Sequence, residues 1–379
     1  MKTKVIAVLL GLGMMIVPST MMAQYNFDRY YSNYKGWEEG DVDLNLFRGV
    51  KPSPDSAKVV VKGELARNEL YVKKGSVSYK YNKVNAYIDY DFCRIAPELI
   101  GDTYAKMYAQ TVMNIYEKYA RIATKEYACE PGAYYFHTEK FISGRMDHHT
   151  KELAESLFEY GDTAEIKRRY DLSVSDLQDI KFDPEECVRS FKEMGGVDYY
   201  VGLCSNVPVS DALSWGIGLN TGFDGYFDYG FFINGDVQIG TCADTKAALS
   251  TEGGSFAKGE ELNFASASIR FGARVINGSR LKVYPFAGFG VLGFTSPHDH
   301  GDTFDKNGVM FSVGMNLDYA LTKKYILEPS AFYGQRCQYN IVRLTPSVSI
   351  TNLRGIGKVT SFNVALSYDR KVLKLRKKN

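Results

Sequence analysis

The sequence predicts an α+β module followed by an all-β, eight-stranded antiparallel transmembrane β-barrel. The first observation is strict two-residue alternation from Val309 to Leu321, where the odd positions are apolar and the even positions are mostly small or polar. Residues 265–275 and 229–239 alternate in the same way. The second observation is that short and long connections take turns between such segments, as in an up-and-down barrel that crosses a membrane.

The composition bounds the number of domains and the class of partner. With 379 residues, 45% of them hydrophobic and 14% aromatic, the chain is long enough for two domains with ordinary cores. Its formal net charge is only +2, and the one basic run, Arg376–Lys378, is interpreted as a solvated tail. We therefore expect no nucleic-acid partner.

The N-terminus predicts export. Lys2 and Lys4 precede an apolar run that ends at Val17, so residues 1–23 are interpreted as a secretory signal peptide. No cysteine follows the apolar run, which argues against a lipid anchor. No later segment has about 18 uninterrupted apolar residues. A membrane location must therefore come from strands.

Residues 24–195 are predicted to form a periplasmic α+β domain. Short alternating segments indicate a small antiparallel sheet, at 42–46, 59–61, 77–81 and 84–90. Asn82-Lys83 is the expected tight connection between the last two segments.

Helices are expected to follow the sheet. A helical period starts near Asp102 and continues for about 25 residues. Further helices are predicted at 147–160 and 162–170, and Asp183 with Pro184 predicts the start of the last one. Gly195-Gly196 then breaks the chain and is taken as the domain boundary.

Residues 196–379 are predicted to form the outer-membrane β-barrel. Eight strands are expected, at 197–205, 214–223, 228–242, 262–276, 281–296, 308–321, 325–337 and 361–371. The short connections are 224–227, 277–280 and 322–324, and the longer ones are 206–213, 243–261, 297–307 and 338–360. This asymmetry places both barrel ends, and the N-terminal domain, in the periplasm.

The alternative is a soluble eight-stranded barrel, whose apolar face points inward. Here the polar face carries charges of both signs that we expect in the lumen, namely Asp236, Arg270, Arg274, Asp318, Glu328, Arg336 and Asp369. Asp318 and Glu328 are the expected partners of Arg270 and Arg274. The apolar face gathers aromatic rings toward strand ends, namely Trp215, Phe223, Tyr229, Tyr319, Tyr325, Tyr333 and Tyr368. Such rings suit membrane interfaces and favour contact with outer-membrane lipid.

Two glycine-rich stretches, 284–294 and 216–223, resemble the small outer-membrane β-barrel superfamily of OmpA/OmpX type. The resemblance covers residues 197–371. The alternation of Phe362, Val364, Leu366 and Tyr368 is similar to the terminal strand that the assembly machinery of that family reads, although about ten residues follow Tyr368 here. The N-terminal domain resembles no family that we can name.

Candidate chemistry is sparse, and neither a cofactor nor a metal is expected. His298, His300 and Asp302 lie together in a predicted outer loop, but their spacing matches no stringent metal motif, so a solvated loop is favoured. Ser296 with His298 is the only neighbouring pair that suggests a lipid-modifying enzyme, and adjacency does not set triad geometry.

Six cysteines would meet an oxidising compartment after export. Cys93 and Cys129 bracket the long predicted helix, and a disulfide between them is the pairing we expect. The full connectivity does not follow from the spacing.

The function expected from the sequence is non-enzymatic. The barrel is expected to anchor a periplasmic module that binds a protein or an envelope component, because eight strands leave an interior filled by side chains rather than a pore. The alternative is an adhesin or ligand binder that acts through the loops 243–261 and 338–360. The oligomeric state is left open.

Overall fold

A computed structural model of the chain describes residues 34–48, 57–129, 148–242, 244–251, 254–296, 306–328, 334–354 and 356–378. The predicted signal peptide lies outside these residues. The chain divides into two compact units. The first comprises Met1–Glu69, Asn85–Glu117 and Leu157–Val174, and the second comprises Leu70–Val84, Lys118–Ser156 and Ser175–Asn379. Segments from both sides of Gly195 therefore belong to the second unit.

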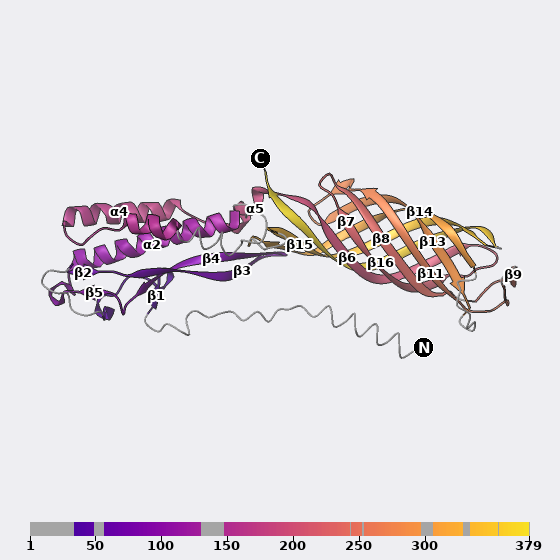
Figure 1. Cartoon of the computed structure of the whole chain (residues 1–379), viewed down its shortest axis with the longest axis horizontal. Coiled ribbons are helices and arrows are strands. Elements are labelled where there is room, and N and C mark those ends of the chain that lie inside the picture. Colours follow the sequence, from indigo (N-terminus) through magenta and orange to yellow (C-terminus); the bar gives the residue numbers. More distant parts are fainter. Residues whose placement is uncertain are drawn as a thin grey trace. The chain divides into compact units, whose positions relative to one another are not determined.

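The described elements that precede the barrel in the chain combine short strands, one long hairpin and helices (Figure 1). They are β1 (Tyr34–Gly36), η2 (Trp37–Glu39), η3 (Leu44–Leu46), β2 (Val59–Val60), β3 (Gly63–Lys74), β4 (Val77–Asp89), β5 (Arg94–Ile95), η4 (Pro97–Leu99), α2 (Thr103–Cys129), α4 (Thr163–Asp179) and α5 (Pro184–Arg189). Residues 148–156 are also helical.

The sheet differs from its prediction in several places, and β3 lies where no strand is predicted. The segment 42–46 is no strand, because Leu44–Leu46 form a turn of 3-10 helix and the Asp43 side chain accepts a hydrogen bond from the Asn45 amide at 3.0 Å. Asn82 and Lys83 form no turn either, since both lie inside β4. The reversal occurs instead between β3 and β4, at Gly75, whose φ of 64° suits glycine.

The long helix α2 is confirmed. The Asp102 carboxylate accepts a hydrogen bond from the Ala105 amide at 2.7 Å, as expected of a residue that caps a helix start. One face of α2 is buried, at Ala105, Tyr108, Ala109, Val112, Met113, Tyr116 and Ala120. Burying each large apolar side chain stabilises the fold by roughly 1.5–3 kcal/mol. Within the first unit, the buried Asn114 amide donates to Ser173 of α4 at 3.1 Å.

Helix α5 begins as the sequence predicts. The Asp183 carboxylate accepts a hydrogen bond from the Glu185 amide at 2.9 Å, and Pro184 occupies the first turn. That backbone hydrogen bond, together with one from Lys74, lowers the pKa of Asp183 below its ordinary value. The cap therefore remains ionised, and charged, under ordinary conditions.

Cys129 forms a disulfide with Cys187 in α5, so the predicted pairing of Cys129 with Cys93 is wrong. Cys93 is a free thiol buried in the first unit, and burial raises its pKa to about 12. Cys93 and Cys129 lie on either side of α2 in the sequence, but the end of α2 lies next to α5. The partner of Cys129 is therefore Cys187, 58 residues further along the chain. The disulfide fixes the end of α2 to the segment that enters the barrel.

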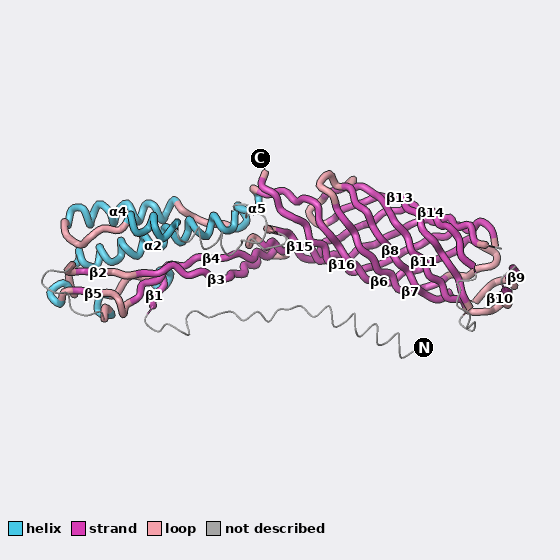
Figure 2. Tube along the Cα trace, viewed as in Figure 1, coloured by secondary structure: helices cyan, strands magenta, loops and turns pink. Residues whose placement is uncertain are grey.

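Eight strands of the second unit form a closed ring, which confirms the predicted strand count (Figure 2). They are β6 (Phe191–Val209), β7 (Gly216–Tyr226), β8 (Phe231–Cys242), β11 (Leu262–Ala273), β13 (Leu281–Thr295), β14 (Lys306–Ile326), β15 (Arg336–Leu353) and β16 (Gly357–Lys377). Each pairs antiparallel with the next, and β16 pairs with β6 to close the ring. Two short strands, β9 (Leu249–Thr251) and β10 (Gly254–Phe256), pair with each other, and β12 (Ile276–Asn277) pairs with β13.

The last two barrel strands correct the prediction. The predicted strand 325–337 and loop 338–360 are wrong, because β15 spans Arg336–Leu353 and only a short turn separates it from β16. The predicted turn 322–324 lies within β14. The predicted long loop at 338–360 is therefore wall of the barrel.

One segment from the N-terminal half of the chain extends the barrel wall. Within the second unit, Val77–Lys80 of β4 pair in parallel with Lys323–Ile326 of β14. Lys80 also forms an ion pair with Glu328 at 2.5 Å. We call the barrel end where β6 begins and β16 ends the mouth, and β4 joins the wall at this end.

Candidate functional site

The barrel wall has an apolar exterior. On β6, the exposed residues Val197, Val201, Leu203, Val207 and Val209 alternate with the buried Asp198, Tyr200, Cys204 and Asn206. On β14, Val309, Phe311 and Val313 are 56%, 64% and 59% exposed, whereas Ser312, Asn316 and Asp318 are buried. The surface that meets the surroundings is thus the apolar one, the reverse of a soluble barrel.

The aromatic residues predicted for the membrane interfaces do not all lie on the outer surface. Trp215, Phe223, Tyr229, Tyr319 and Tyr368 are exposed on the outside. Tyr325 lines a pocket at the mouth instead, and Tyr333 lies outside the described residues. No helix in the described ranges is both long and apolar enough to span a membrane.

The interior is centred on Arg343, which is 2% exposed. Its guanidinium contacts four carboxylates from four strands: Asp318 at 2.7 Å, Asp224 at 2.6 Å, Asp198 at 2.9 Å and Asp369 at 2.8 Å. Lys371 shares Asp318 at 3.0 Å, and its ammonium lies 3.8 Å from the Tyr226 ring centroid. We call these six charged residues the Arg343 network. It connects β6, β7, β14, β15 and β16 across the lumen.

A second ion pair joins β8 to β11. Arg270 donates to the Asp236 carboxylate at 2.5 Å, and both side chains are buried. Tyr200 and Asn220 donate to the other Asp236 oxygen at 2.7 Å and 2.6 Å. Asp236 therefore has partners for both oxygens, as a buried carboxylate requires.

The predicted lumen charges are placed in two groups. Asp236, Arg270, Asp318 and Asp369 lie inside the barrel, although Arg270 pairs with Asp236 and not with Asp318 or Glu328. Arg274 lies past the end of β11, at the mouth, and Glu328 pairs with Lys80 beyond the end of β14. Arg336 is half-buried at the start of β15. For Arg274, Glu328 and Arg336 the lumen prediction is wrong, because each lies at or beyond a strand end.

Four members of the Arg343 network were missed, namely Asp198, Asp224, Arg343 and Lys371. Asp198, Asp224 and Lys371 fall at the edges of predicted strands or turns, and Arg343 falls in a segment read as a loop. The signal that could have found Arg343 is the alternation of Val342, Leu344, Val348 and Ile350 around it.

Apolar clusters lie on either side of the polar layer. Toward the mouth, Tyr226, Phe232, Tyr284, Phe286, Cys337, Tyr339, Ile341 and Leu373 pack together. Toward the other end, a cluster includes Leu213, Phe256, Leu262, Phe264, Phe294 and Leu353. Side chains thus fill the described interior, and the charges lie between two apolar layers.

Two β-bulges change which side chains face the mouth. On β14 the buried residues up to Asp318 are even-numbered, but the pairing with β15 shifts between Ala320 and Thr322, after which Lys323 and Tyr325 line the mouth. On β6 the pairing with β16 shifts between Gly196 and Glu193, which turns Glu193 inward. A bulge inserts one residue and so exchanges the two faces of a strand.

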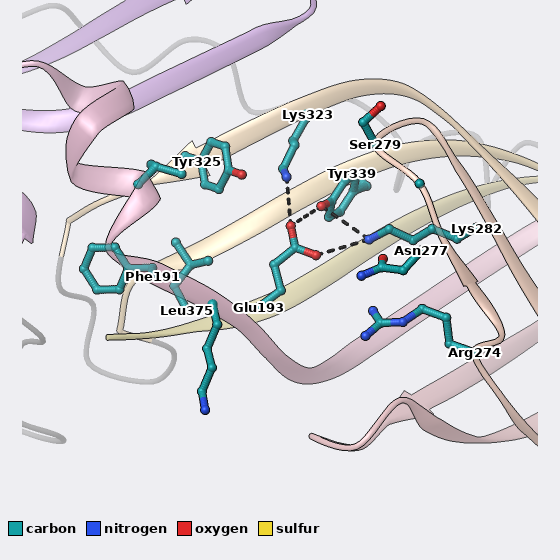
Figure 3. Close-up of a pocket in the computed structure, with 13 residues that line it drawn as sticks. Phe191, Glu193, Arg274, Asn277, Ser279, Lys282, Lys323, Tyr325, Tyr339 and Leu375 are labelled. Atoms are coloured by element: carbon teal, nitrogen blue, oxygen red, sulfur yellow. Dashed lines mark hydrogen bonds and ion pairs between the residues drawn. The ribbon is translucent and has the colours of Figure 1, made fainter. Parts of the chain in front are cut away.

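Glu193 joins strands from opposite sides of the ring (Figure 3). Its carboxylate accepts from Lys323 of β14 at 2.8 Å, from Lys282 of β13 at 3.1 Å, and from the Tyr339 hydroxyl of β15. Lys282 also donates to the Tyr339 hydroxyl at 3.4 Å and lies 4.4 Å from that ring's centroid. We call Glu193, Lys282, Lys323 and Tyr339 the mouth cluster.

The mouth cluster borders a cavity of about 430 Å³, the mouth pocket. Figure 3 shows Arg274, Asn277 and Lys282 side by side, facing Glu193. They lie between the end of β11 and the first residues of β13. Lys192 and Ser279 also line the pocket. This volume lies within the range of small-molecule sites, roughly 300–1,000 Å³.

The remaining predicted site residues give no assembled centre. His298, His300 and Asp302 lie outside the described residues. Ser296 is described, and its hydroxyl donates to Glu260. Within the described ranges, no group of three or more His, Cys, Asp or Glu side chains is arranged to hold a metal ion.

Comparison with known proteins finds solved structures that match about half of this chain. No family model and no curated protein matches the sequence. Among solved structures, Ail, the attachment invasion locus protein of Yersinia pestis, is 13% identical, with a TM-score of 0.28, over 47% of this chain and 99% of that one. OprG from Pseudomonas aeruginosa is 11% identical, with a TM-score of 0.28, over 48% and 96%. Neisserial surface protein A is 14% identical, with a TM-score of 0.28, over 47% and 96%.

Proposed function

We propose that this chain is a non-enzymatic outer-membrane β-barrel protein whose barrel anchors a periplasmic α+β module that binds a protein or envelope component. The observation that carries the proposal is the inverted distribution of polarity. Alternate residues put large apolar side chains outside and Arg343, Lys371 and four aspartates inside. Such a surface is stable against hydrocarbon and costly in water.

The filled interior supports an anchor rather than a channel. Arg343 and Lys371 are at most 2% exposed, and the described interior has apolar clusters on both sides of them. A water-filled path would need these side chains to move apart, breaking ion pairs at 2.6–3.0 Å.

The chain direction supports a periplasmic module. Among the barrel strands, β6 begins and β16 ends at the mouth, and β4 joins the wall there. In even-stranded outer-membrane barrels both chain ends face the periplasm. The segments before β6 would then lie in the periplasm together with the mouth.

The adhesin alternative requires two long loops, and one of them is mostly strand in the structure. Of the two loops it requires, 338–360 is occupied mostly by β15 and the start of β16, which leaves 243–261. The enzyme alternative requires His298 beside Ser296, and His298 lies outside the described residues. The segments before β6 form a folded module in which one face of α2 is buried. Such a module supports recognition better than the loop 243–261 or Ser296 does.

Protease treatment of sealed cells tests the topology. Cells producing the full chain should keep α2 intact, because the outer membrane excludes the protease from the periplasm, and fractionation should recover the chain with the outer membrane. Permeabilised cells provide the control, in which the module becomes accessible. Cleavage within residues 100–125 on sealed cells, or recovery of the chain from the soluble periplasm, would contradict the proposal.

Photocrosslinking in living cells tests which part binds a partner. A photoreactive residue at Phe92 or Leu172, which are 63% and 50% exposed in the first unit, should capture a defined partner from the full chain. The matched control is Lys258, which is exposed in the segment 243–261. Adducts from Lys258 but from neither module position would support the adhesin instead.

A further inference from the structure

The mouth pocket carries more positive charge than its one carboxylate balances. Lys192, Arg274, Lys282 and Lys323 line it, and Glu193 is the acid among the lining residues. Two of these cations, Lys282 and Lys323, already share Glu193. The charge of the other two is not balanced inside the pocket, so a bound anion would be attracted there.

Hydrogen-bond donors in the pocket are available to a ligand. Arg274 lines the pocket, and its guanidinium offers five N–H donors. Asn277 and Ser279, at the turn between β12 and β13, add an amide and a hydroxyl. Lys282 has a side chain 7% exposed and uses two donors, toward Glu193 and Tyr339, so one of its three is left.

The backbone is arranged to gather these groups. A regular β14 would point Thr322 and Lys324 inward, and a regular β6 would point Glu193 outward. The two bulges instead bring Lys323 and Glu193 to the pocket from strands on different sides of the ring. Glu193 then holds the ammonium groups of Lys282 and Lys323 in place, 3.1 Å and 2.8 Å away.

We propose that the mouth pocket binds a phosphate group, with Arg274 and Lys282 as its principal donors and Lys192 at the rim. A planar guanidinium fork beside ammonium groups fits the oxygens of phosphate. The pocket has room for a phosphate ester larger than the free ion. The excess of cations favours a doubly charged group over a single carboxylate. This site goes beyond the proposed anchoring function and does not depend on it.

Titration calorimetry with inorganic phosphate tests the site on the full chain in a nonionic detergent at low ionic strength. Wild-type protein should bind, and Arg274→Gln should weaken the affinity about tenfold or more, since a charge-assisted pair is lost. Arg280→Gln is the matched control, because Arg280 belongs to the same turn but contacts Tyr319 outside the pocket. Its affinity should equal that of the wild type.

Lys192→Gln is a second variant that keeps the test valid if Arg274→Gln folds poorly, because Lys192 is exposed. It should weaken binding while the folded barrel retains its gel mobility. An absence of phosphate binding by the wild type, or an equal loss in Arg274→Gln and Arg280→Gln, would overturn the proposal.

The phosphate could come from a soluble ester or from a lipid headgroup. Glycerol 3-phosphate titrated into protein held in phosphatidylcholine and in phosphatidylglycerol nanodiscs separates these sources. If the ligand is soluble, both discs give the same Arg274-dependent affinity. If the anionic lipid occupies the pocket, phosphatidylglycerol blocks the soluble ester in the wild type, and the block is absent in Arg274→Gln.

Discussion

Replacing Arg343 with methionine should lower the free energy of unfolding of the barrel by about 3–5 kcal/mol, the usual cost of removing one partner from a buried ion pair. Arg343 contacts Asp198, Asp224 and Asp369, and shares Asp318 with Lys371. Methionine fills part of the volume but supplies no donor, so three buried carboxylates lose a cation at once.

Urea unfolding followed by gel mobility of the folded barrel measures this effect. Arg370→Met is the matched control, because Arg370 is exposed on the outer face of β16. Its cost should stay within about 1 kcal/mol, as for a side chain near the membrane interface. Adding Asp224→Asn and Asp369→Asn to Arg343→Met should recover part of the loss. Equal costs for Arg343→Met and Arg370→Met would contradict the buried network.

The alternation of the barrel could be predicted wherever one face is uniformly apolar. On β6 and β14 the exposed residues are apolar and most buried ones polar, so the period is visible. On β15 the inward residues change from Tyr339 and Ile341 to Arg343 and Thr345. The apolar face of the pattern therefore switches sides within one strand. For this reason the sequence predicts a loop at 338–360, where most of β15 lies, and does not predict an inward Arg343.

The mouth cluster could not be predicted for a different reason. The sequence predicts a turn at 322–324 and no barrel strand before 197, so it places neither Lys323 nor Glu193 in the wall. Even along β14 and β6 as the structure has them, regular alternation would put both side chains on the outer face, and only a bulge reverses that. The bulges depend on how each strand pairs with its neighbour, at Ala320–Thr322 and at Leu373–Leu375. The disulfide has the same origin, because Cys129 and Cys187 meet only after α2 and α5 are placed. Sequence patterns describe single elements, whereas these features come from pairs of them.

Replacing Val313 with arginine should destabilise the barrel by about 2–4 kcal/mol in a bilayer, the cost of a cation at the midplane on a lipid-facing strand. Val313 is 59% exposed and lies near the middle of the outward apolar run 309–321 on β14. In water, the same change at an exposed position away from structural features usually stays within about 0.5 kcal/mol. The result therefore distinguishes a lipid-facing wall from a soluble one.

Val309→Arg is the matched control, because Val309 is 56% exposed on the same strand and face but lies at the end of the run. Near the membrane interface an arginine costs only about 0–1 kcal/mol, since its long side chain reaches water. Reversible unfolding in phospholipid vesicles compares the two variants directly. A large difference between Val313→Arg and Val309→Arg requires a gradient of polarity along the strand, which a bilayer has and bulk water lacks. Equal and small costs would mean that β14 faces solvent along its whole length, and the outer-membrane assignment would fail with it.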